Sequence, residues 1–290
     1  MTSFNRRRAK SKTALFSKAR GNKLSLRHAQ LDQREPARPS FRRRGIYLLP
    51  NAFTTAALFC GFYAIVMAMN LKFDYASIAI FAAMVLDGID GRVARLTNTQ
   101  SEFGAQYDSL SDMVSFGAAP ALVVYEWSLR GLGKLGWLAA FVYCAGAALR
   151  LARFNTNIAV VDKRYFQGLP SPAAAAMVAG LVWLMDDLHY AGSDLSWLAW
   201  VVTAYAGITM VTNVPFYSFK DVNFGKSVPF IAIFLIALLY VAVSSNPPMV
   251  LFGLFVCYGL SGYCVYFWRL LKGRPVSIIE TETDPVDEKE

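Results

Sequence analysis

Residues 87–112 read DGIDGRVARLTNTQSEFGAQYDSLSD and join two apolar runs, FDYASIAIFAAMVL before Asp87 and MVSFGAAPALVVYEW after Asp112. The four aspartates of this stretch form two pairs: Asp87 is three residues from Asp90, and Asp108 is four residues from Asp112. Residues at these separations lie on one face of an α-helix, so each pair is predicted to occupy a single face. The polar connector LTNTQSEFG is expected to let the second helix turn back, which can bring the two acidic faces together.

Four convergent carboxylates repel one another unless a cation lies between them. The stretch contains no Cys or His, and oxygen-only ligands favour magnesium, manganese or calcium over zinc. Gly91 and Ala94 lie on or beside the first acidic face, so a ligand can approach the backbone closely there, and Arg95 adds a cation. The alternative is a solvated acidic rim at a helix hairpin. The apolar runs argue against it, because they place the charges at a membrane boundary, where ionisable groups are usually functional.

The stretch fits the pattern D-x2-D-G-x2-A-R-x8-G-x3-D-x3-D without any change in spacing. In this it resembles the signature of the CDP-alcohol phosphatidyltransferases. The resemblance implies that a CDP-linked lipid donates its phosphatidyl group to a hydroxyl and releases CMP. It also implies roles for individual residues: metal ligation by Asp87, Asp90 and Asp108; proton removal by Asp112, with metal ligation as its second role; and contact with the cytidine diphosphate by Gly91, Ala94, Arg95 and Gly104.

The composition predicts an all-α polytopic membrane protein. Of the 290 residues, 55% are hydrophobic, and the mean hydropathy is +0.35, which is too apolar for an ordinary soluble domain. About eight apolar segments have roughly membrane-spanning length, at 47–69, 74–96, 106–129, 134–154, 171–188, 196–216, 227–245 and 249–271. We therefore expect a transmembrane helix bundle over residues 45–272, flanked by tails at 1–44 and 273–290.

The charge is concentrated in the amino-terminal tail. Residues 1–44 carry 14 Lys or Arg and two acidic residues, so their net charge is +12, whereas the whole chain carries +9. This tail is predicted to be mostly disordered and to attract anionic lipid headgroups. It lacks the interleaved aromatic residues of a nucleic-acid-binding segment, so no nucleic-acid partner is expected. The carboxyl-terminal tail, residues 273–290, is acidic and is also predicted to be disordered.

The positive charges also predict the orientation in the membrane. Arg42, Arg43 and Arg44 directly precede the first span, and the connectors 97–105 and 155–170, with their edges, carry further Lys and Arg. Positively charged loops remain in the cytoplasm, so both termini and the four motif aspartates are expected on the cytoplasmic side.

Other common site chemistries are not indicated. The four cysteines lie inside apolar segments and form no CxxC pattern, so neither a disulfide framework nor a zinc site is predicted. The two histidines, His28 and His189, lie in the tail and in a polar connector, away from the aspartates. Any general base must therefore be another type of residue.

Two further segments carry candidate site residues. At the first span, Pro50 precedes Asn51 and Thr54, which suits the start of a helix. Alternatively, the P-N-x2-T pattern resembles the family's first helix and implies that Asn51 and Thr54 hold the nucleotide or its phosphates. At the end of the fourth span, RLARFN contains Arg150, Arg153 and Asn155. Its arginines either anchor the helix at the membrane surface or bind a phosphate or a substrate carboxylate.

The segments G-x3-R-L-A-R-F-N, FQGLPSPAA and DSLSDMVSFGAAPA resemble one branch of the family, the membrane-embedded phosphatidylserine synthases of bacteria. This resemblance covers roughly residues 47–271. It implies CDP-diacylglycerol as donor, L-serine as acceptor, Mg²⁺ or Mn²⁺ as cofactor, and the bacterial inner membrane as location. Members of the family are often homodimers. Glycerol phosphate, inositol phosphate and choline are the alternative acceptors. A cation transporter is the contrasting class, but it predicts carboxylates near span midpoints rather than at span ends.

Overall fold

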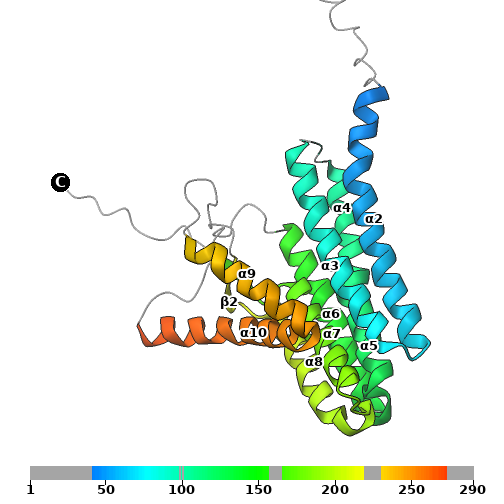
Figure 1. Cartoon of the computed structure of the whole chain (residues 1–290), viewed down its shortest axis with the longest axis vertical. Helices are drawn as coiled ribbons and strands as arrows, with labels where there is room; N and C mark the ends of the chain where they lie inside the picture. The colour runs from blue at the N-terminus through cyan, green and yellow to red at the C-terminus, as the bar shows by residue number, and fades with distance from the viewer. Residues whose placement is uncertain (1–40, 98, 100, 157–164, 219–229, 273–290) are drawn as a thin grey trace, which may run out of the picture. The chain divides into compact units, whose positions relative to one another are not determined.

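The computed structural model describes residues 41–97, 99, 101–156, 165–218 and 230–272 (Figure 1). Disorder was predicted for the tails 1–44 and 273–290; residues 41–44 instead begin a helix, and the rest of both tails lies outside the described range. Parts of the predicted connectors, 157–164 and 219–226, and the first residues of the predicted span 227–245 also lie outside it. The described residues from Tyr47 onward form one compact unit, and the contacts below belong to it.

Helices dominate this unit, which confirms the predicted all-α class. The helical elements, in chain order, are α2 (Phe41–Met69), α3 (Phe73–Leu96), α4 (Glu102–Asp112), the π-helix η1 (Met113–Ala118), α5 (Ala119–Trp127), the 3₁₀ turn η2 (Leu129–Leu132), α6 (Lys134–Thr156), α7 (Ser171–Asp187), the 3₁₀ turn η3 (Gly192–Leu195), α8 (Ser196–Val211), α9 (Phe230–Ser245) and α10 (Pro247–Leu271). Two three-residue strands, β1 (Tyr165–Gln167) and β2 (Pro215–Tyr217), form an antiparallel ribbon.

Helical segments occupy all eight predicted spans, but within the part of the chain that the structure describes, four are both long and apolar enough to cross a membrane. These four are Leu49–Met69, Lys134–Thr156, Gly192–Val211 and Pro247–Leu271. Helix α3 is long enough, but every 18-residue stretch of it contains at least three charged residues, always including Asp87 and Asp90. The third predicted span is divided into α4, η1 and α5, whereas α7 and α9 are 17 and 16 residues long. The protein is thus an integral membrane protein with a helical fold.

Helix α7 forms the centre of the unit. All but one of the residues from Ser171 to Val182 are buried, and α7 packs against α3, α5, α8 and α10. The sequence SPAAAAMVAG at its start explains this position, because small side chains let neighbouring backbones approach closely. Figure 1 shows α2, α3 and α4 alongside one another, and hydrogen bonds from α2 to α3 and to α4 join them. The acidic ends of α3 and α4 therefore lie at one end of a helix group.

The close crossing of α6 and α8 depends on two glycines. A Cβ atom at Gly207 would lie 2.7 Å from Cα of Tyr143, and a Cβ atom at Gly146 would overlap the carbonyl oxygen of Gly207. Neither position tolerates a larger side chain without separating the helices. This contact fixes α6, whose carboxyl-terminal end carries the RLARFN segment, relative to α8.

Helix α8 ends at Val211, so the predicted span 196–216 is too long at its carboxyl end. Thr212 is extended, and Pro215, which lacks an N–H group, begins β2. Gly168 has a φ of +72°, and its amide donates to the carbonyl of Val214 at 2.9 Å. The ribbon therefore continues the chain beyond the end of α8, where the sequence predicted more helix.

Candidate active site

The two acidic helix ends converge as the aspartate spacing predicts. One carboxylate oxygen from each of Asp87, Asp90 and Asp108 lies within 4.8 Å of the others. Ser101 caps α4 by accepting a hydrogen bond from the amide of Gly104 at 3.0 Å. This N-cap satisfies an otherwise free amide and so fixes where α4 begins.

Asp112 and Asp108 complete the cluster in different ways. The carboxyl group of Asp112 is in hydrogen-bonding contact with that of Asp87. Among the described residues, Asp108 Oδ1 is buried and has no hydrogen-bond partner. A buried carboxylate oxygen without a partner is costly, and a cation held between the acidic groups would satisfy it. The cluster is therefore compatible with a divalent metal site built from oxygen ligands.

The first helix reaches this cluster through Thr54. Its side chain is buried, and its hydroxyl donates to Asp90 Oδ2 at 2.7 Å. Asn51 lies on the same side, with Oδ1 3.4 Å from the position that a Cβ atom would take at Gly104. Pro50 lies inside α2, which begins at Phe41, so the helix-start interpretation of this segment is wrong. Asn51 and Thr54 both face the aspartate motif.

The surface of α3 beside the aspartates is open. Among the described residues, and apart from the adjoining backbone of α3 itself, no atom lies within 4 Å of the position of a Cβ atom at Gly91. Arg95 is exposed, and its Nε donates to the carbonyl of Gly91 at 2.9 Å, one helical turn earlier. Ala94 is half-buried between them. A ligand at the cluster therefore meets little steric resistance on this side of α3.

Helix α4 is attached to its neighbours by hydrogen bonds that the sequence did not predict. Ser111 Oγ donates to the carbonyl of Thr54 at 3.1 Å, and the hydroxyls of Thr55 and Tyr107 lie 2.9 Å apart. These bonds join α4 to α2 on both sides of Asp108. The serines of DSLSDMVSF were a signal for such contacts, because small hydroxyl residues in membrane helices often hydrogen-bond across helix interfaces.

The polar residues of the RLARFN segment, at the end of α6, lie in two different environments. Asn155 Nδ2 donates to Ser109 Oγ at 3.0 Å, so Asn155 contacts α4 next to the aspartate cluster. Arg150 is buried, donates to the carbonyl of Gln167 at 3.0 Å and lies 6.0 Å from the ring centre of Phe166. Neither arginine is among the described ion pairs.

Arg153 instead binds the carboxyl-terminal end of α8 and the ribbon. The acceptors that lie 2.8 to 3.4 Å from its guanidinium nitrogens are the carbonyls of Gln167, Met210, Val211 and Thr212 and the side chain of Asn213. The last carbonyls of a helix have no partner within it, and a cation there satisfies them. Arg153 is thus a C-terminal cap for α8.

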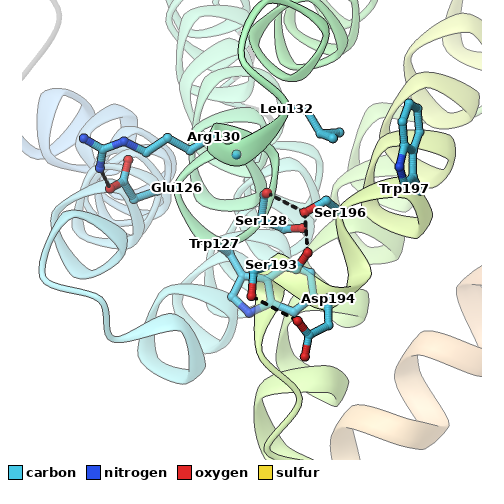
Figure 2. Close-up of a pocket in the computed structure, with 10 residues that line it drawn as sticks. Glu126, Trp127, Ser128, Arg130, Leu132, Ser193, Asp194, Ser196 and Trp197 are labelled. Atoms are coloured by element: carbon cyan, nitrogen blue, oxygen red, sulfur yellow. Dashed lines mark hydrogen bonds and ion pairs between the residues drawn. The ribbon is translucent and has the colours of Figure 1, made fainter.

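A separate cavity of about 340 Å³ lies between η2, η3 and the start of α8 (Figure 2). Its lining includes none of the predicted site residues. Its exposed Arg130 pairs with Glu126 at 2.6 Å. Ser128 Oγ donates to the carbonyl of Gly192 at 2.6 Å, and Ser196 Oγ lies 3.1 Å from the carbonyl of Ser128. These hydrogen bonds hold the two turns together. Because the lining contains none of the aspartates, the cavity is distinct from the aspartate site.

The comparison with known proteins agrees with this geometry. The family model described as CDP-alcohol phosphatidyltransferase matches residues 47–211. The CDP-diacylglycerol–serine O-phosphatidyltransferase of Helicobacter pylori strain 26695 is 35% identical over 219 residues, which cover 74% of this chain and 90% of that protein. The protein of the same name from Mycobacterium leprae is 29% identical over 228 residues, covering 77% of this chain and 76% of the relative. The chain therefore belongs to the CDP-alcohol phosphatidyltransferase family.

Proposed function

We propose that this protein transfers the phosphatidyl group of CDP-diacylglycerol to the hydroxyl of L-serine, giving phosphatidylserine and CMP. The observation that carries the proposal is the convergence of Asp87, Asp90 and Asp108 beside an open helix face, in a chain similar to the named serine O-phosphatidyltransferase of Helicobacter pylori over 90% of that protein's length. The donor is a pyrophosphate, and its reaction requires positioning and charge stabilisation more than covalent chemistry.

Each motif residue has a role in this reaction. Asp87, Asp90 and Asp108 would hold Mg²⁺ or Mn²⁺, with Asp112 as a further candidate ligand. The bound metal would offset negative charge on the pyrophosphate and on the departing CMP. Asp112 accepts the proton of the serine hydroxyl. The serine oxygen attacks the phosphorus of the phosphatidyl group, and the bond between that phosphorus and CMP breaks.

The remaining motif residues bind the CDP-lipid. We assign this role to Asn51, Thr54, Gly91, Ala94, Arg95 and Gly104. The open backbone at Gly91 leaves room for a phosphate, and the exposed Arg95 provides a cation beside it. Thr54 donates to Asp90, so it also holds a metal-binding carboxylate in place.

An acceptor screen tests the function directly. Purified protein is supplied with CDP-diacylglycerol, Mg²⁺ and one of L-serine, glycerol phosphate, inositol phosphate or choline. We expect CMP and the new lipid to form in equal amounts with serine and at background with the others, and a reaction without acceptor measures hydrolysis. Preference for another acceptor would reassign the substrate, and absence of CMP with every acceptor would favour the transporter alternative.

For the serine carboxylate we propose Arg150 rather than Arg153, with Asn155, which contacts α4 beside the aspartates, as a further acceptor-binding residue. Arg150 is buried and outside the described ion pairs, and among the described residues one backbone carbonyl accepts a hydrogen bond from it. A guanidinium offers five N–H groups, so several remain for an anion. The N–H groups of Arg153 instead donate to carbonyls at the end of α8 and in the ribbon. A carboxylate entering an apolar bundle needs a charged partner, which Arg150 supplies.

We expect Arg150→Lys to raise KM for serine roughly 10- to 150-fold, because the charge remains but the forked pair to a carboxylate is lost. KM for CDP-diacylglycerol should change less. Arg153→Lys is the matched control. It should lower the melting temperature by weakening the α8 cap, while serine KM stays close to wild type. Unchanged serine kinetics in Arg150→Lys would contradict the assignment, and an effect on donor KM alone would assign Arg150 to a phosphate.

We also propose that the protein is a homodimer of the bacterial inner membrane with its active site facing the cytoplasm. The orientation rests on the Lys and Arg bias of the connectors. It lets the lipid donor arrive from the bilayer while serine and CMP exchange with the cytoplasm. Labelling of cysteines introduced near each terminus checks the orientation, because labelling from opposite sides would refute an even number of spans.

A further inference from the structure

The π-helix η1 begins directly after Asp112 and separates the acidic helix α4 from α5. Its hydrogen bonds span five residues; for example, the amide of Ala119 donates to the carbonyl of Val114. Pro120 follows one residue later and has no N–H group. In an α-helix that N–H would donate to the carbonyl of Phe116, which lies in the fully buried part of the fold. The proline therefore removes the usual donor for a buried carbonyl.

Tyr143 on α6 supplies a donor to this carbonyl from outside the helix. Its hydroxyl donates to the carbonyl of Phe116 at 3.0 Å, and its side chain is fully buried. A buried carbonyl without a partner would carry a desolvation cost, so this bond stabilises the backbone at the point where Pro120 interrupts helical bonding.

The π-helix is held from two sides. On the α6 side, a Cβ atom at Gly117 would lie 3.2 Å from Cβ of Ala147, so the two helices are in close contact. On the α2 side, Ser115 Oγ donates to the carbonyl of Ala57 at 3.1 Å. A Cβ atom at Gly61 would lie 2.7 Å from Cα of Ser115. Tyr143 lies at the close crossing of α6 and α8, which fixes its position. Its hydroxyl therefore holds the π-helix at the carbonyl of Phe116.

The π-helix determines which way the preceding aspartates point. A hydrogen bond that spans five residues rather than four adds a residue to the turn, so it rotates α4 about its axis relative to α5. Return of this segment to α-helical bonding would turn Asp108 and Asp112 away from Asp87 and Asp90. We propose that Tyr143 is a positioning residue for Asp112 and Asp108, acting through the carbonyl of Phe116. This inference rests on the proposed function, in which Asp112 accepts the serine proton.

The first test is Tyr143→Phe, which keeps the ring and removes the hydroxyl. We expect kcat for phosphatidyl transfer to fall roughly 5- to 100-fold, since a buried carbonyl loses its partner. KM for serine and for CDP-diacylglycerol should stay within about twofold, because neither substrate touches Tyr143. Tyr205→Phe is the matched control. It removes a hydroxyl that donates to the carbonyl of Gly259 at 2.9 Å, in the contact between α8 and α10.

The control variant should lose comparable thermal stability but keep its kcat within about twofold of wild type. Equal kcat losses in Tyr143→Phe and Tyr205→Phe, or no loss in Tyr143→Phe, would overturn the proposal. Absence of CMP release from the wild-type protein would instead refute the proposed function.

A second variant, Pro120→Ala, tests whether Tyr143 acts through the carbonyl of Phe116. It also provides a second background for Tyr143→Phe if that variant folds poorly on its own. Pro120→Ala restores an amide that can donate to the Phe116 carbonyl. In the Pro120→Ala background, Tyr143→Phe should therefore lower kcat and melting temperature less than it does in the wild type. Equal losses in the two backgrounds would show that Tyr143 does not act through this carbonyl and would contradict the inference.

Discussion

Removal of divalent metal with EDTA is expected to reduce CMP release on the order of 10³-fold or more, and added Mg²⁺ or Mn²⁺ to restore it. The reason is electrostatic. Three carboxylate oxygens lie within 4.8 Å of one another, and a buried oxygen of Asp108 has no partner among the described residues. Without a cation these groups repel one another and cannot hold a negatively charged pyrophosphate beside them.

Thermal unfolding gives a measurement independent of turnover. A metal that binds only the folded protein raises the melting temperature as its concentration increases. We expect this shift in the wild type and its loss in Asp108→Asn. Asp194→Asn is the matched control, because Asp194 is an exposed aspartate in η3, outside the cluster. Full turnover in metal-free buffer, or an equal melting shift in Asp108→Asn, would exclude the metal site as assigned.

The sequence predicted the helices and the acidic cluster because both depend on local spacing. Aspartates three and four residues apart share a helix face whatever surrounds them. A polar connector with a Ser cap reverses the chain between two apolar runs. Membrane-length apolar runs similarly fix where helices occur, and helical segments lie at every predicted span.

The features that were not predicted depend on contacts between distant residues. The end of α8 at Val211 reflects pairing of Tyr165–Gln167 with Pro215–Tyr217 and capping by Arg153, which neither segment reveals alone. The two arginines of RLARFN are equivalent in the sequence and differ only because one of them reaches the last turn of α8. The π-helix likewise requires a tyrosine from another helix opposite Pro120.

Substitution of Asp112 tests the proposed removal of the proton from the serine hydroxyl. Asp112→Asn keeps the size and polarity of the side chain but removes its ability to accept a proton. We expect kcat with serine to fall on the order of 10²- to 10⁴-fold, the usual contribution of a general base. KM for CDP-diacylglycerol should change little, because the residues of α2 and α3 that we propose to bind the donor remain in place.

The melting shift with Mg²⁺ separates the two roles that Asp112 can have. A pure base leaves three metal-binding carboxylates intact, so Asp112→Asn should retain the shift while its kcat collapses. Loss of both would make Asp112 a metal ligand as well, which its contact with Asp87 permits. A kcat close to wild type would remove Asp112 from the mechanism. Because His28 and His189 are the only histidines of the chain and neither belongs to the motif, the proton acceptor would then have to be a neighbouring carboxylate, with Asp108 tested next.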